Sequence, residues 1–557
     1  MQVFRGQVSL WIRFLTVRMV IAAGIAFQSI PGYSQQPVPP GTGLGLEVSV
    51  KDRLPDDDEY ALSAHALIGL GEQLFVANWT VQEGGGRPQT KGNGLPLSVP
   101  SEPLVFPRAF NRLSAPDANS CAGCHNSPGP GGNGDIVANV FVLGQRFDFA
   151  QFDGNLVVTH SATDESGRQP NLSQIANSRA TPGMFGSGYV EMLARQMTAA
   201  LQALRDTLLP GFEVRLLAKG VDFGILARHE DGTWVTSQVI GLAAPSLASP
   251  GPDQPPSLLV RPFHQAGNVI SIRQFTVNAL NHHHGIQPTE RFGADTDPDG
   301  DGWANEITRA EVTALTLFQA CMAVPGRVVP RVSAIEQAIR RGEQLFESVG
   351  CAVCHIPSLP LDNQGWIFTE PSPYNPIGNA NPANVRVYSV DLSNDSLPQP
   401  RLKPRRGVVY VPAFTDLKLH DITSGPEDPN VEALDMNQPA GSPGFFAGNA
   451  KFLTRKLWGA GSKPNFFHHG QYTTLREATL AHAGEASHSR LAFEALSEAD
   501  RNCMIEFLKS LRILPASQMQ TSLVVDEHGS PREWPPLTAT GVGVAGASTD
   551  RATPPHP

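Results

Sequence analysis

The sequence lacks an excess of positive charge, and this excludes one large class of function. Its 557 residues carry 42 Lys and Arg against 52 Asp and Glu, a formal net charge of −10. Because proteins bind nucleic acids through a basic face, this balance argues against a nucleic-acid partner. Beyond the N-terminus the chain also lacks any unbroken apolar run of the ~18 to 20 residues that a spanning helix requires. We therefore expect no membrane span in the mature protein.

Cysteine is scarce, with six in the chain, but four of the six stand in two CxxC pairs. Each pair is followed directly by histidine, in Cys121-Ala-Gly-Cys124-His125 and Cys351-Ala-Val-Cys354-His355. This pattern attaches haem c because the two thiols add to the vinyl groups while the adjacent imidazole reaches the iron. We expect two covalently bound haems, and we weigh disulfides or a shared zinc ion as the alternatives. Cys321 and Cys503 are expected to be buried thiols, with a mutual disulfide as the alternative.

Glycine and proline are abundant, at 53 and 48 residues, which predicts many turns and long connections. The N-terminus has the pattern of an export signal: Arg5, Arg13 and Arg18 precede the apolar residues 19–30, and small residues follow at 32 and 34. We interpret residues 1–34 as a signal peptide and expect a periplasmic protein. A retained membrane anchor is the alternative.

An internal repeat accompanies the two CxxCH motifs. Gly71-Glu-Gln-Leu-Phe75 recurs letter for letter as Gly342-Glu-Gln-Leu-Phe346. In the second copy the apolar residues share one helical face, and the helix leads into the attachment site, as in a cytochrome c domain. In the first copy a Gly/Pro-rich insertion intervenes at residues 83–107.

The expected fold is mainly α, with two cytochrome c-like haem domains, long irregular loops and small β insertions. We place the N-terminal haem domain at 35–325 and the C-terminal one at 326–515. A helix that begins at the N-cap Ser497 and carries an apolar stripe to Leu514 closes the second domain. Residues 516–557 are rich in Pro, Thr, Gly and Ser and are expected to form a disordered tail.

Between the two motifs lies a calcium-type loop. It fits D-x-D-x-D-G-x5-E, with candidate ligands Asp295, Asp297, Asp299, Asp301 and Glu306. Carboxylates at this spacing converge on a hard cation, and Gly300 permits the sharp turn. An acidic turn without metal is the alternative.

The segment from Phe467-His468-His469-Gly470 through Leu475-Arg-Glu477-Ala478 to His482 resembles the signature of the bacterial di-haem cytochrome c peroxidase and MauG superfamily. In that superfamily the sixth ligand of the C-terminal haem lies fourteen residues after the turn histidine. Counted from His468, the resemblance implies that His482 is this ligand, opposite His355. The C-terminal iron would then be six-coordinate and would carry electrons.

More specifically, the chain resembles the di-haem oxidoreductase family, through residues 119–125, 179–191, 415–421 and 457–459. The chain departs from the family at Arg261-Pro-Phe-His264, where the family tends to have Trp after Arg-Phe-Gly. The resemblance implies that Arg179 and Glu191 serve catalysis, with Glu191 as acid/base; solvation of a helix accounts for Glu191 equally well. Further pocket candidates are His264, Gln265 and the run His282-His283-His284.

These features predict a periplasmic peroxidase-like oxidoreductase. A small redox protein would reduce the His355/His482 haem, which would pass electrons to the His125 haem, where hydrogen peroxide is reduced. One alternative is a MauG-like oxidase or an oxygenase that acts on a protein or a hydrophobic substrate. The other is a non-catalytic electron-transfer cytochrome with both irons six-coordinate. The sixth ligand of the N-terminal haem stays open.

Overall fold

The computed structural model describes residues 45–85, 118–139, 177–298, 302–432, 434–438, 443–514 and 521–534. Residues 1–46 and 47–557 form separate units, and the description below concerns the second unit. The predicted signal peptide lies outside the described residues. Among the described residues, no helix is long and apolar enough to cross a membrane.

Helices make up 33% and strands 16% of the structure, so the prediction of a mainly α fold is wrong, and the fold is mixed α/β with small sheets. The longer helices are α1 (Ala64–Val76), α5 (Ser187–Asp206), α7 (Ile272–Ala279), α9 (Arg309–Ala320), α10 (Ser333–Ser348), α13 (Ser487–Ala495) and α14 (Glu498–Ser510). The shorter helices are α2 (Cys121–Cys124), α6 (Ala244–Leu247), α8 (Thr289–Phe292), α11 (Pro443–Phe446) and α12 (Leu475–Leu480). Single turns of 3-10 helix are η1 (Asp58–Ala61), η2 (Val81–Glu83), η6 (Cys351–Val353), η7 (Ala460–Ser462) and η8 (Gly484–Ala486), and η5 (Leu280–His284) is a π-helical turn.

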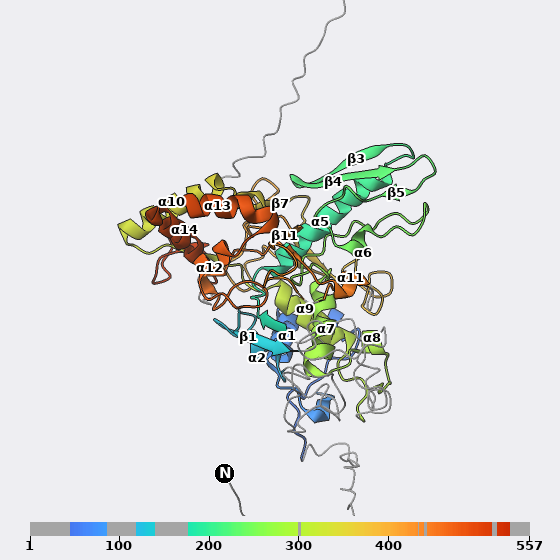
Figure 1. Cartoon of the computed structure of the whole chain (residues 1–557). Helices are drawn as coiled ribbons and strands as arrows, with labels where there is room; N and C mark the ends of the chain where they lie inside the picture. The colour runs from blue at the N-terminus through green and yellow to red at the C-terminus, as the bar shows by residue number, and fades with distance from the viewer. Residues whose placement is uncertain are drawn as a thin grey trace, which may run out of the picture. The chain divides into compact units, whose positions relative to one another are not determined.

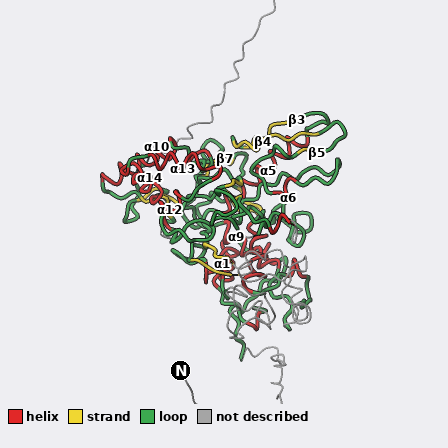
Figure 2. The backbone as a smooth tube through the Cα atoms, viewed as in Figure 1, coloured by secondary structure: helices red, strands yellow, loops and turns green. Residues whose placement is uncertain are grey.

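The strands form small sheets within the long connections, as Figure 2 shows. The antiparallel pairs are β1 (Ile136–Asn139) with β2 (Asn177–Ala180), β7 (Leu359–Leu361) with β10 (Val409–Val411), β8 (Ile367–Glu370) with β9 (Tyr388–Asp391), and β11 (Leu419–Asp421) with β12 (Lys451–Leu453). A larger antiparallel sheet contains β3 (Glu213–Ala218), β4 (Val221–Arg228) and β5 (Trp234–Val235). Strands of two to four residues are too short for alternation to identify them, which is why the sequence indicated small β insertions without giving their positions.

A second three-stranded sheet includes residues from the segment expected to form the tail. Strand β6 (Gly326–Val328) lies between β13 (Leu511–Arg512), which is antiparallel to it, and β14 (Val524–Val525), which is parallel. Val524 and Val525 therefore pair with β6. Residues 515–520 and 535–557 are outside the described residues.

The two copies of the repeat stand at equivalent helix crossings. In α1, a Cβ at Gly71 would lie 2.1 Å from the carbonyl oxygen of Ala314 in α9. In α10, a Cβ at Gly342 would lie 2.0 Å from the carbonyl oxygen of Cys503 in α14. Each glycine thus permits backbone contact between two helices that lie side by side (Figure 1).

The phenylalanine that ends each repeat packs in the same way. Phe75 meets Phe318 of α9 at a centroid distance of 5.2 Å and an interplanar angle of 55°. Phe346 meets Phe507 of α14 at 5.4 Å and 59°. The α1/α9 pair, here called the first module, and the α10/α14 pair, the second module, are therefore structural repeats. Ser497 accepts a hydrogen bond from the backbone N–H of Asp500, which confirms it as the N-cap of α14.

Candidate functional site

The first CxxCH motif forms a short helix beside the first module. Cys121–Cys124 form α2, and His125 follows at its end. His125 Nδ1 lies 2.9 Å from the carbonyl oxygen of Pro182, so Nδ1 carries the proton and Nε2 is the nitrogen with a lone pair. Burial lowers the pKa of His125 to about 4, so the imidazole is neutral near pH 7. A neutral imidazole whose other nitrogen is anchored to a carbonyl is the form that binds iron.

The second motif repeats this arrangement. Cys351–Val353 form the turn η6, and His355 Nδ1 donates to the carbonyl oxygen of Phe414 at 3.1 Å. Burial likewise lowers the pKa of His355 to about 4. The phenylalanine of each repeat lies beside the histidine of its motif. The ring centroids are 6.3 Å apart for Phe75 and His125 and 6.3 Å apart for Phe346 and His355.

The two alternatives to haem gain no support from the structure. None of the six cysteines, Cys321 and Cys503 included, forms a disulfide. Among the described residues, the His/Cys/Asp/Glu group that could hold a metal ion is Cys354 with Asp416 and His420, and it contains only one CxxC cysteine. The two CxxC pairs therefore form neither disulfides nor one shared zinc site, and their thiols, with an oriented imidazole beside each pair, fit the attachment of haem c.

His482 is the residue that the resemblance implies as the sixth ligand. It follows α12, whose first turn is closed by a capping box of Thr474 and Glu477. Its Nδ1 donates to the carbonyl oxygen of Ala478 at 2.7 Å, so Nε2 is the nitrogen available to an iron. After burial, interaction with His482 contributes to the lowered pKa of His355. The ligand assignment itself stays a prediction.

Arg179, predicted as catalytic, is buried at the end of β2 and pairs with Glu432. Arg179 Nη1 lies 2.5 Å from Glu432 Oε1, and the side chains are 9% and 0% exposed. Gln265 Nε2 donates to both oxygens of Glu432, at 2.9 and 3.1 Å. His468, stacked on Phe452, approaches the same carboxylate at 3.9 Å. These contacts hold Glu432 in a single orientation inside the protein.

His264 completes this cluster. Both of its ring nitrogens are buried, and neither has a hydrogen-bond partner among the described residues. Burial lowers the pKa of His264 to about 3, with a further contribution from Arg179. Pro182, which accepts the hydrogen bond from His125, lies three residues after Arg179, so the cluster lies near the first CxxCH motif. We call Arg179, Glu432, Gln265, His264 and His468 the Arg179 cluster.

Glu191 lies in a different network from Arg179. Its Oε1 pairs with Arg195 at 2.5 Å, one turn further along α5, and its Oε2 accepts the backbone N–H of Ile272 at 2.8 Å. Arg195 also donates to the carbonyl oxygen of Thr369. Glu191 thereby joins α5 to the start of α7 and, through Arg195, to β8. The carboxylate that Arg179 meets is Glu432.

The sequence reasoning missed Glu432 because no motif marks it. It lies in an irregular segment and forms an isolated bridge with Asn449. Its partner Arg179 is remote in the chain, so only the tertiary fold brings them together. His264 and Gln265 were candidates, whereas His282 has no described side chain.

The calcium prediction remains untested, since Asp299 and Asp301 lie outside the described residues. Asp295 Oδ1 accepts from Asn305 Nδ2, and Asp297 Oδ2 accepts from the backbone N–H of Gly302. Glu306 is buried, and its Oε2 accepts the backbone N–H of Gln287 at 2.7 Å.

Two modules, each with an oriented CxxCH histidine, define a protein built to hold two haems, and one comparison agrees. Residues 382–511 match the model of the family described as "Di-haem oxidoreductase, putative peroxidase", which confirms the resemblance that the motifs indicated. This match supports an enzyme of the general di-haem oxidoreductase type. No curated protein gave a significant match. Among solved structures, a hydrazine synthase from Kuenenia stuttgartiensis, pressurised with xenon, aligns at 15% identity and a TM-score of 0.23. The alignment covers 57% of this chain and 87% of the other.

Proposed function

We propose that the chain is a c-type di-haem peroxidase whose substrate, hydrogen peroxide, is reduced at the His125 haem. The observation that carries this proposal is the Arg179 cluster, in which a buried ion pair faces a neutral histidine with two unpartnered ring nitrogens. Buried polar atoms are normally hydrogen-bonded, and exceptions mark places where a ligand or water belongs. A small oxidant with donor and acceptor oxygens fits such a place.

A haem held by Cys121, Cys124 and His125 would supply the redox-active iron that the reduction of peroxide requires. The chain's own residues provide the proton chemistry. Glu432 accepts a proton from the bound oxidant and returns it to the departing oxygen, which is general acid–base catalysis. Arg179 and Gln265 orient the carboxylate, and the guanidinium offsets negative charge that develops beside it.

His264 stays neutral over the working pH range because burial lowers its pKa to about 3. A neutral imidazole offers one N–H donor and one acceptor, so it can position a peroxide without adding charge. Electrons would enter at the second module, through the haem held by His355 and His482. A small redox protein is the proposed donor, and export by residues 1–34 would place the reaction in the periplasm.

The test compares two glutamates in matched surroundings. Glu432 and Glu191 each pair with an arginine at 2.5 Å, each is 0% exposed, and the arginines are 9% and 8% exposed. Breaking either buried pair should cost about 3–5 kcal/mol of stability. Only Glu432→Gln should lower peroxide turnover, by about 10²- to 10⁴-fold in kcat at unchanged haem content. If Glu191→Gln lowers kcat equally, or if Glu432→Gln leaves it unchanged, the assignment of Glu432 is wrong.

A further inference from the structure

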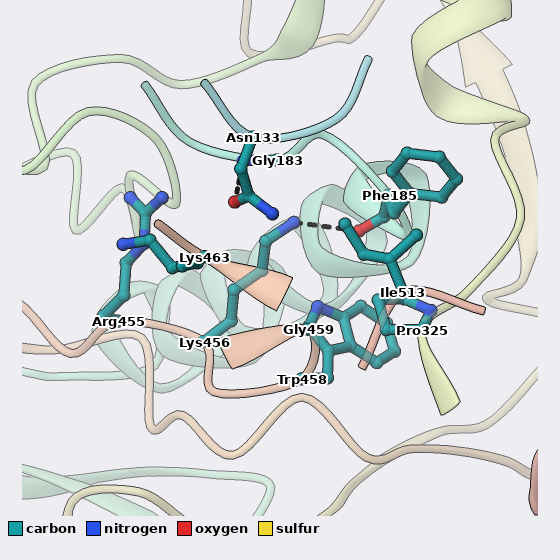
Figure 3. Close-up of a pocket in the computed structure, with 10 residues that line it drawn as sticks. All are labelled: Asn133, Gly183, Phe185, Pro325, Arg455, Lys456, Trp458, Gly459, Lys463 and Ile513. Carbon is teal, nitrogen blue, oxygen red and sulfur yellow. Dashed lines mark hydrogen bonds between the residues drawn. The ribbon is translucent and has the colours of Figure 1, made fainter. Parts of the chain in front are cut away.

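A pocket lies at the seam between the two modules (Figure 3). Asn133 and Gly183, joined by a hydrogen bond of 2.9 Å, line it from the side of the first CxxCH motif. From the side of the second module it is lined by Arg455, Lys456, Trp458, Gly459, Lys463 and Ile513. Lys456 bridges the two sides, because its Nζ donates to the carbonyl oxygen of Phe185 at 2.9 Å.

Three cations line this pocket, and the described residues provide no carboxylate to neutralise them. The surrounding protein lowers the pKa of Lys456 and of Lys463 to about 7, and the charge of Arg455 lowers both further. Arg455 is exposed and the two lysines are partly exposed, as expected of side chains that line an open pocket. Since like charges that line one pocket repel one another, the three side chains indicate that an anion belongs among them.

The position of the three cations indicates which anion the pocket binds. Gly183, which lines the pocket, directly follows Pro182, whose carbonyl oxygen accepts the hydrogen bond from His125. On the other side, the backbone N–H of Leu457 donates to the carbonyl oxygen of Ala413, the neighbour of Phe414, which accepts the hydrogen bond from His355. The cluster therefore lies beside both histidines that are expected to bind iron. A haem carries two propionate carboxylates on the edge opposite its vinyl groups, so anionic groups would reach this region from either attachment site.

We propose that Arg455, Lys456 and Lys463 form a carboxylate-binding site that takes haem propionates at the seam between the modules. This inference rests on the proposed function, because it requires haem at the CxxCH motifs. The bound carboxylates would neutralise the cations, and the cations would stabilise the reduced iron, since reduction adds a negative charge near them.

The test measures reduction potentials of the holoprotein by spectroelectrochemistry. Lys456→Met and Lys463→Met should each shift a haem potential to more negative values. Lys463→Arg keeps the positive charge and should therefore have the wild-type potential. Lys509→Met is the matched control, because Lys509 is exposed on α14 and pairs with Glu506. If Lys463→Met and Lys509→Met give the same potentials, the proposal is wrong. Fewer than two haems per chain in the wild-type protein would instead refute the proposed function.

The anion in the pocket could also be a free carboxylate instead of a haem propionate. Added acetate distinguishes these two sources. If propionates occupy the site, the wild-type potentials do not change with acetate concentration at constant ionic strength. If they do change, the site binds a free anion and the propionate assignment is overturned. Should Lys463→Met fail to load haem, the wild-type protein still provides a test. Its redox-induced infrared difference spectrum should contain ionised propionate bands that Lys456→Arg shifts, and unshifted bands would refute the site.

Discussion

Substitution of Gly71 by alanine tests the helix crossing on which the first module depends. A Cβ there would lie 2.1 Å from the carbonyl oxygen of Ala314 and 2.8 Å from Cβ of Phe318. Carbon atoms prefer separations of about 3.5–4.0 Å, so α1 and α9 must move apart by roughly 1 Å. Overpacking of this kind costs about 1–3 kcal/mol.

Gly69 provides the control within the same helix. A Cβ at Gly69 meets nothing within 4 Å, so alanine there should stabilise α1 by about 0.5–1 kcal/mol through helix propensity alone. The two variants should differ by roughly 1.5–4 kcal/mol in the free energy of unfolding, measured by denaturant titration at equal haem content. If Gly71→Ala unfolds at the same denaturant concentration as Gly69→Ala, the crossing is not as close as the structure shows.

Two further predictions concern pH and calcium. His264 binds a proton below pH 6.5 in the unfolded chain but only near pH 3 in the folded one, so the free energy of unfolding should fall as the pH drops through this window. His264→Gln should flatten that part of the stability profile, and an unchanged slope would show that His264 is not buried neutral. If the loop of Asp295 and Asp297 binds calcium, a chelator should remove one calcium ion per chain and lower the melting temperature. Neither change would occur if the loop is an acidic turn without metal.

The sequence predicted the parts of this fold that short-range patterns determine. The two CxxCH motifs, the repeat around Gly71 and Gly342, and the helix that begins after Ser497 all depend on residues close together in the chain. The role of α9 as the counterpart of α14 follows from packing against α1, which no local pattern encodes.

The Arg179 cluster illustrates what sequence reasoning could not reach. The resemblance implied Arg179 and Glu191 as catalytic residues, whereas the carboxylate that pairs with Arg179 is Glu432. A buried arginine needs a counterion that is close in space, which can be remote in the sequence. Glu432, in an irregular segment, is this counterion. The pocket at the seam was missed for the same reason, since Gly183 and Lys463 are remote in the chain and line one pocket only in the folded protein.

The central claim is that the two haems are unequal, one closed for electron transfer and one open for substrate. Electron paramagnetic resonance of the fully oxidised protein tests this claim most directly. The account predicts one low-spin signal from the His355/His482 iron and one high-spin signal from the His125 iron. His482→Ala should convert the low-spin signal to high spin. Two low-spin signals with no high-spin iron would contradict the account and indicate an electron-transfer cytochrome instead.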